Sequence, residues 1–157
     1  MKKFSLTDLL IFILSAELGG AITALFSGGF TEQYSKLIEP PLSPPPIVFL
    51  IVWPILYALM GISAYLIWYT KSKKTRSAQI IYSIQLALNF SWSIITFRFE
   101  ALLLSSVLSI ILLVFVSIMI YKFKPLNHVA AIIQIPYLIW CLFATYLIFA
   151  TYILNKQ

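Results

Sequence analysis

The sequence predicts an all-α integral membrane protein: a bundle of five transmembrane helices forming a single domain over residues 1–157. Hydrophobic residues make up 61% of the chain and charged residues 10%, whereas a soluble domain is about a quarter charged. Five apolar runs reach the roughly 20 residues that a helix needs to cross a bilayer. Short connectors after the second run favour antiparallel neighbours in one compact bundle.

In chain order, the predicted spans are residues 6–26, 46–70, 77–97, 101–121 and 126–153. The first run follows Lys2 and Lys3 and has no small-residue cleavage site, so we expect a retained span rather than a signal peptide. The one long connector, residues 27–45, lies between the first and second spans.

Basic residues predict the orientation in the membrane. Eight would lie on one side and three on the other. The larger group is Lys2, Lys3, Lys71, Lys73, Lys74, Arg76, Lys122 and Lys124, and the smaller is Lys36, Arg98 and Lys156. We expect a cytoplasmic membrane, and because cytoplasmic loops carry the excess of Lys and Arg, the N terminus would then lie inside and the connector outside. The net charge of +6 is explained by orientation, so we expect no nucleic-acid partner.

The connector contains five prolines within residues 40–46 and leads directly into the second span. Proline fixes φ and lacks a backbone donor, so this stretch is expected to be stiff and extended. It is either a lid fixed over a pocket or a loop that ends in a sharp helix start.

The third span has a polar stripe at helical spacing, made of Tyr82, Gln85, Asn89, Trp92 and Thr96. An unpaired amide facing hydrocarbon costs several kcal/mol, so Gln85 and Asn89 are expected to point inward. Two roles are open for them: hydrogen bonds between helices or recognition of a ligand.

The fifth span repeats this pattern with Gln134, Tyr137, Trp140, Ala144 and Thr151, and the second places Trp53, Tyr57 and Gly61 in one row. Pro136 and Pro54 are expected to bend these two helices. Two bent helices with inward aromatic rings can enclose a cavity suited to a large planar apolar ligand. Core packing would use the same residue types.

Glu17 is a lone carboxylate in the first span, available for function or for a hydrogen bond to a neighbouring helix. Small residues form two rows, Ala16, Gly20, Ala24 and Ser83, Ala87, Ser91, which permit close helix contact within the bundle or across a homodimer. Cys141 and His128 are each the sole residue of their type, so no metal site is expected.

Three segments together resemble the TspO/MBR family, which comprises the tryptophan-rich sensory proteins of bacteria and the mitochondrial translocator protein (peripheral-type benzodiazepine receptor). They are EPPLSPPPIVFLIVWPILYALMGISAYLIW (39–68), QLALNFSW (85–92) and IPYLIWCLFATYL (135–147). The resemblance implies five transmembrane helices, often dimeric, with a cavity under the connector between the first two. It also implies binding of protoporphyrin IX, haem, sterols, and isoquinoline carboxamide and benzodiazepine ligands, with no required cofactor.

Residues carried over by motif would line the pocket: Trp53, Tyr57, Asn89, Trp92, Trp140 and Ala144, with Phe143 nearby. By the same resemblance, Pro44 and Pro45 would shape the lid, and Leu147, Tyr152 and Lys156 match a loose sterol pattern. Pro41-Leu42 replaces the usual Ser-Trp before the double proline, so Leu42 offers no indole to the lid.

The leading hypothesis is therefore a membrane receptor or sensor for tetrapyrroles and similar planar lipophiles. A second is light-dependent porphyrin breakdown, in which Trp53 and Trp140 supply oxidisable indoles without conventional acid–base catalysis. A third is transport of a lipophile across the membrane.

Overall fold

The computed structural model describes residues 4–28 and 36–156, and within them it is all-helical. Its helices are α1 (Leu6–Phe26), α3 (Pro46–Trp68), α4 (Thr75–Phe97), α5 (Leu102–Phe123), α6 (His128–Ile132) and α7 (Ile135–Leu154). Five spans are long and apolar enough to cross a membrane, the last formed by α6 and α7 together. The predicted five-helix membrane bundle is confirmed.

The last span differs from its prediction in being broken rather than bent. α6 ends at Ile132, and α7 begins at Ile135 with a proline in its first turn. Pro136 has no N–H to donate, and the first turn of a helix is where a missing donor costs nothing. Pro54, in contrast, lies inside the continuous helix α3.

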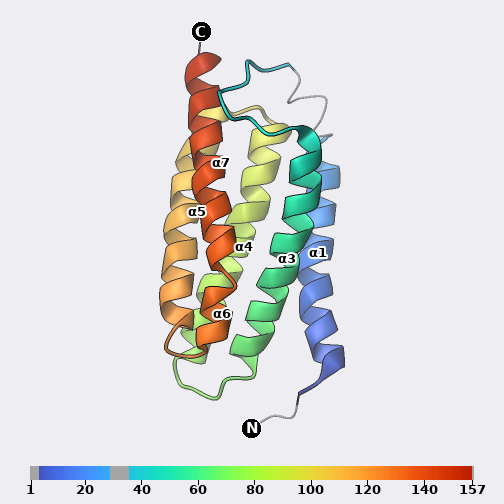
Figure 1. Ribbon diagram of the computed structural model, residues 1–157, viewed down its shortest axis with the longest axis vertical. Coiled ribbons are helices and arrows are strands. Elements are labelled where there is room, and N and C mark those ends of the chain that lie inside the picture. The colour runs from blue at the N-terminus through green and yellow to red at the C-terminus, as the bar shows by residue number, and fades with distance from the viewer. Residues whose placement is uncertain (1–3, 29–35, 157) are drawn as a thin grey trace.

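The helices run along the long axis of the molecule, and consecutive membrane spans are antiparallel, with α6 and α7 continuing in one direction as the last span (Figure 1). α1 packs on α3, α4 on α5, and α5 on α7. The start of α1 and the 69–74 loop lie at one end, which we call the loop end; the connector and the C terminus lie at the other, the connector end (Figure 1).

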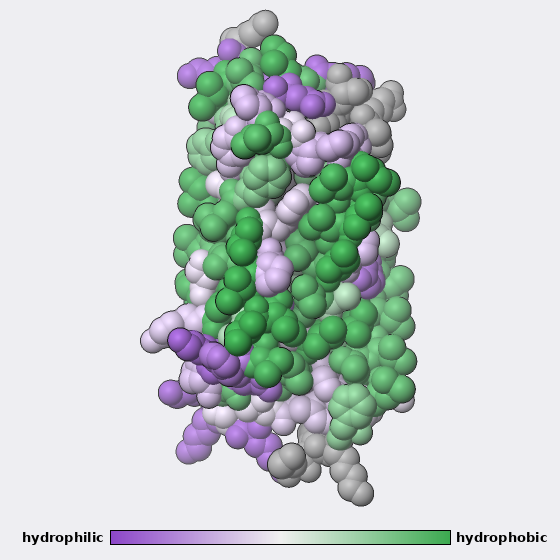
Figure 2. Space-filling model, viewed as in Figure 1, coloured by the Kyte–Doolittle hydropathy of each residue, from purple (hydrophilic) through white to green (hydrophobic). Residues whose placement is uncertain are grey.

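Hydrophobic side chains cover the middle of the visible face, and hydrophilic ones gather toward both ends, as expected for a membrane-spanning protein (Figure 2). The described lysines of the larger basic group lie at the loop end, whereas Lys2 and Lys3 fall outside the described residues. The direction of the N terminus across the membrane stays a prediction.

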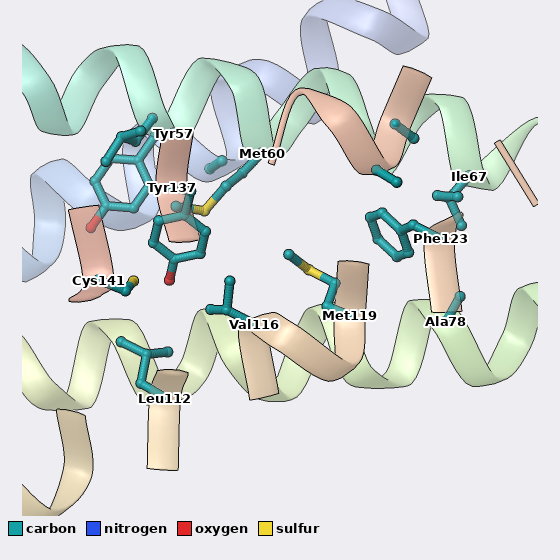
Figure 3. Packing of buried hydrophobic residues seen from close by; sticks show 14 residues of the cluster. Tyr57, Met60, Ile67, Ala78, Leu112, Val116, Met119, Phe123, Tyr137 and Cys141 are labelled. Atoms are coloured by element: carbon teal, nitrogen blue, oxygen red, sulfur yellow. The ribbon is translucent and has the colours of Figure 1, made fainter. Parts of the chain in front are cut away.

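The buried core runs between the helices (Figure 3). Met60, Val116, Met119, Phe123 and Tyr137 are fully buried and come from α3, α5 and α7. The side chains of Tyr57, Tyr137 and Cys141 lie close together toward one end of this core (Figure 3). That end carries the polar and aromatic groups of the candidate site.

α1 and α3 approach closely because small residues line their contact. A Cβ placed on Gly61 would lie 2.5 Å from the Cα of Ile13, so only glycine fits there. Ala16 and Gly20 of the first small-residue row are buried in the bundle, whereas Ser83, Ala87 and Ser91 on α4 are exposed. Ala16 and Gly20 therefore serve the bundle, whereas Ala24 is exposed, and a homodimer stays a prediction.

The connector is attached to α7 at two places. Asn155 pairs with the backbone of Ile38 through two hydrogen bonds of 2.9 and 3.0 Å, and the Tyr146 hydroxyl donates to the carbonyl of Pro41 over 2.9 Å. Part of the predicted lid, residues 29–35, falls outside the described residues. The described part is fastened across the end of the bundle.

Candidate ligand-binding site

A chain of hydrogen bonds crosses the bundle between α3, α4 and α7. The Tyr57 hydroxyl donates to Oδ1 of Asn89 (2.8 Å), and Nδ2 of Asn89 donates to the Tyr137 hydroxyl (3.1 Å). That hydroxyl donates in turn to Oε1 of Gln85 (2.9 Å). All four side chains are buried, so Gln85 and Asn89 point inward as predicted, and in this state they serve hydrogen bonding between helices.

Two buried donors near this chain have no hydrogen-bond partner among the described residues: Nε2 of Gln85 and the indole N–H of Trp140. Trp92 differs, because its indole N–H donates to the carbonyl of Ser105 on α5 over 3.0 Å. A buried donor without a partner carries a desolvation penalty of about 1–3 kcal/mol. Such donors are where a ligand acceptor would be stabilised most.

Aromatic rings from α3 and α7 meet beside the hydrogen-bond chain. Trp53 stacks on Tyr57 at a centroid distance of 5.5 Å and meets the edge of Trp140 at 6.4 Å. Phe49 and Phe143 lie on either side of Trp140, at 5.6 and 5.7 Å. Rings at these distances attract one another beyond simple area burial. We call Phe49, Trp53, Trp140 and Phe143 the aromatic cluster.

On one side of the cluster, a cavity of about 210 Å³ opens between α1, α3 and α4 near the connector end. Trp53 and Tyr57 form one wall, and Glu17 of α1 is the carboxylate in its lining. Pro54, also in the wall, removes the N–H that would bond the carbonyl of Leu50 one turn earlier. The cavity is apolar with a few acceptor groups at its edge.

On the other side, a smaller cavity of about 50 Å³ lies between α4, α5 and α7. Trp92, Ala144 and Leu147 line it, and Leu37 of the connector contributes from the end of the bundle. Phe49 borders both cavities, and so does Phe97. The connector therefore lies over a space that aromatic side chains divide in two.

The structure brings together most of the residues that the sequence predicted for the pocket. Trp53, Trp92 and Ala144 border one small void of about 10 Å³ between the two cavities. Tyr57 joins the larger cavity, and Asn89 lies behind Tyr57 as its hydrogen-bond partner. Trp140 and Phe143 contact the wall through the aromatic cluster.

The predicted lid and sterol residues are more scattered. Pro45 caps the start of α3 in an extended conformation, with φ −56° and ψ 149°, and Pro44 precedes it. Leu147 is buried in the smaller cavity, whereas Lys156 is exposed beyond the end of α7. Leu42 adopts a positive φ of 68° and is 79% exposed, so it points away from both cavities.

Sequence reasoning did not single out Phe49, Phe97 or Ser93, although all three line the larger cavity. Phe49 precedes Trp53 by four residues and Ser93 follows Asn89 by four, so helical spacing from the chosen residues could have identified both. Phe97 is one turn beyond Ser93 and follows from the same rule.

The groups that line the two cavities are mostly apolar and aromatic. Within residues 4–28 and 36–156, no three His, Cys, Asp or Glu side chains gather where they could hold a metal ion. The chemistry of the site is that of recognition: ring faces for apolar contact and a few buried polar atoms for orientation.

The chain is similar to known proteins over nearly its whole length. It is 30% identical to the Tryptophan-rich protein TspO of Chlorobaculum tepidum, over 99% of both chains. It is 34% identical to the Archaeoglobus fulgidus protein of the same name, over 83% of this chain and 88% of that one. Similarity extends to Translocator protein 2 of Mus musculus, at 30% over 64% of each chain. Residues 11–154 match the model of the TspO/MBR family, and the protein is a multi-pass membrane member of that family.

Proposed function

We propose that this protein is a receptor or sensor that binds porphyrins, such as protoporphyrin IX and haem, and other planar lipophiles. These include sterols and isoquinoline carboxamide or benzodiazepine ligands. The observation that carries the proposal is the aromatic cluster between two apolar cavities beneath the connector. The chain is also similar to proteins named Tryptophan-rich sensory protein and Translocator protein, and these names are consistent with a sensory or translocating role.

The cavities are smaller than the ligand. Sites for small molecules and cofactors are typically about 300–1,000 Å³, whereas the larger cavity holds about 210 Å³. Binding therefore requires the side chains of Phe49 and Trp53 to move and join the two cavities. These partly or fully buried rings have neighbouring empty space on both sides, which gives them somewhere to go.

Affinity and orientation come from different groups. A planar ligand that buries about 300 Å² of apolar surface gains roughly 7 kcal/mol of transfer free energy, whereas one hydrogen bond contributes about 1 kcal/mol. Ring contacts with Trp53 and Trp140 thus supply most of the affinity. The unpaired indole N–H of Trp140 fixes orientation by donating to a carbonyl or carboxylate oxygen of the ligand.

The test is a titration of the purified protein with protoporphyrin IX in detergent in the dark, following the Soret band. Ala144→Phe fills the space between the cavities and is expected to weaken binding about tenfold or more, because the added ring occupies ligand volume. Leu142→Phe enlarges a 52% exposed side chain on the same helix and is expected to leave affinity unchanged. Equal affinity of both folded variants and the parent would contradict the proposed site.

Light-dependent porphyrin breakdown is a second candidate, favoured by the edge-to-face contact of Trp140 with Trp53, which lines the larger cavity. In this candidate the excited porphyrin takes one electron from an adjacent indole, and dioxygen, the terminal oxidant, reacts with the porphyrin radical that results. Loss of the Soret band under light, faster than for free porphyrin and slowed in Trp53→Phe/Trp140→Phe, supports this candidate. An identical rate in the parent and the double variant contradicts it.

A further inference from the structure

A further hollow, separate from the cavities of the candidate site, lies at the loop end of the bundle. It measures about 850 Å³ and forms where α4 begins, α5 ends and α6 follows. Its lining includes Lys74, Ser77, Tyr121, Lys122, Lys124 and His128, and we call it the basic hollow. A volume in the range of small-molecule sites means that it can hold a group much larger than a single ion.

The charge in the basic hollow is unbalanced. Three lysines line it and no carboxylate does. Among the described residues at the loop end, Asp8 is the acidic side chain, and it accepts a hydrogen bond from the Tyr69 hydroxyl on the far side of α3. Like charges in one concavity raise the local potential and favour an anionic occupant.

One lysine of the hollow is held in place. Nζ of Lys122 on α5 donates to the hydroxyl of Ser77 on α4 over 2.8 Å, which joins the two helices at the mouth of the hollow. An ammonium group has three donors, so two are left for a ligand. The other two lysines are exposed. Lys74 immediately precedes α4, and Lys124 immediately follows α5.

Apolar stripes continue from both members of the pair toward the middle of the bundle. On α4, Ile80 and Ile84 follow Ser77 at three and seven residues, and on α5, Ile118 and Val114 precede Lys122 at four and eight. These spacings put each set on one helix face. All four side chains are exposed, between 37% and 51%.

We propose that the basic hollow binds the phosphate headgroup of an anionic phospholipid, whose two acyl chains lie along the exposed stripes of α4 and α5. The anionic headgroup would contact the lysines at the end of the bundle, and the acyl chains would contact the apolar stripes nearer its middle. This is the order in which headgroup and hydrocarbon occur in a bilayer. Tyr121, 80% exposed at the edge of the hollow, is placed at the depth where aromatic side chains occupy the membrane interface. Basic pockets between spanning helices recognise lipid headgroups through this chemistry.

A soluble phosphate compound would account for fewer features of this surface than a phospholipid. It would satisfy the lysines but leave the stripes of Ile80, Ile84, Val114 and Ile118 unused. The position of these stripes directly below the Ser77–Lys122 hydrogen bond favours a ligand that is both anionic and lipidic.

The test is native mass spectrometry of the full-length protein in neutral detergent, with phosphatidylglycerol and phosphatidylcholine of identical acyl chains in competition. The parent protein is expected to retain phosphatidylglycerol about tenfold or more over phosphatidylcholine. Lys74→Gln/Lys122→Gln/Lys124→Gln is expected to abolish the preference. The matched control, Lys71→Gln/Lys73→Gln/Arg76→Gln, removes the same charge from the same end but outside the hollow, and is expected to keep it.

Three results would overturn the proposal: no preference in the parent, equal loss in both triple variants, or displacement of the lipid by millimolar glycerol 3-phosphate. The last would indicate a site for soluble phosphates. Far-ultraviolet circular dichroism and thermal unfolding in lipid-free detergent verify that the variants are folded. If the triple variant does not fold, Lys124→Gln and Lys124→Glu each change one exposed side chain. Both are expected to lower the preference for phosphatidylglycerol, and Lys124→Glu is expected to lower it more.

Discussion

Two tryptophans of the candidate site, Trp92 and Trp140, have opposite polar environments. The indole N–H of Trp92 donates to the carbonyl of Ser105, whereas that of Trp140 has no partner among the described residues. Trp92 therefore joins α4 to α5. Trp140 carries an unused donor that becomes valuable only when an acceptor enters.

This difference predicts unequal effects of the same substitution. Trp92→Phe is expected to lower the free energy of unfolding by about 1 kcal/mol more than Trp140→Phe, because only the first removes a hydrogen bond. Unfolding by a denaturing detergent, followed by circular dichroism, measures both. Equal losses would mean that the Trp92 hydrogen bond adds nothing.

Asn89 lies at the centre of the buried hydrogen-bond chain. Asn89→Ala removes its bonds to the Tyr57 and Tyr137 hydroxyls and is expected to destabilise the protein by about 1–2 kcal/mol. Ser91→Ala on the same helix is the control, because Ser91 is exposed and bonds only to the carbonyl of Ala87 one turn earlier. If the two variants unfold alike, the chain is not a stabilising element.

At the scale of elements, the α1–α3 contact is the least tolerant of added volume. The backbone of Ile13 fills the space where a side chain at position 61 would begin. Gly61→Ala is expected to force the helices apart and cost about 1–3 kcal/mol. Thermal unfolding in detergent measures this cost, with Ala87→Val on the exposed face of α4 as the control. An unchanged midpoint for Gly61→Ala would contradict the close approach.

The connector is an element whose order depends on α7. Asn155→Ala removes both hydrogen bonds to Ile38 and is expected to increase hydrogen exchange in residues 36–43 without affecting α3. Lys156→Ala, one residue further on and exposed, is expected to leave exchange unchanged. Unaltered protection in Asn155→Ala would show that other contacts hold the connector.

At the scale of the whole molecule, the sequence predicted the fold well because hydropathy and length alone define spans in a bilayer. The inward direction of Gln85 and Asn89 followed from the cost of amides in hydrocarbon. The break at residues 133–134 was expected only as a bend, since a proline's position signals disruption but not where the helix restarts.

The limits of sequence reasoning at the site have a physical origin. Ring cavities depend on how side chains from α1, α3, α4 and α7 meet, and helical spacing within one element does not report such contacts. Helical spacing from Trp53 and Asn89 could have placed Phe49 and Phe97 on the inward faces of their helices, but it could not show that both border two cavities. Leu42 differs again: its positive φ and exposure are set by the turn of Pro40–Ser43 rather than by the pocket.

The central claim is that porphyrin binds among the aromatic rings at the connector end, and the chain's own tryptophans provide the sharpest test. Protoporphyrin IX affinity should be measured in the dark for Trp140→Ala and for Trp68→Ala, both verified as folded. Trp68 is 50% exposed at the opposite end of α3, roughly 22 Å along the helix from Trp53. We predict that Trp140→Ala loses saturable binding and that Trp68→Ala keeps it; equal affinities, or a loss confined to Trp68→Ala, would contradict the account.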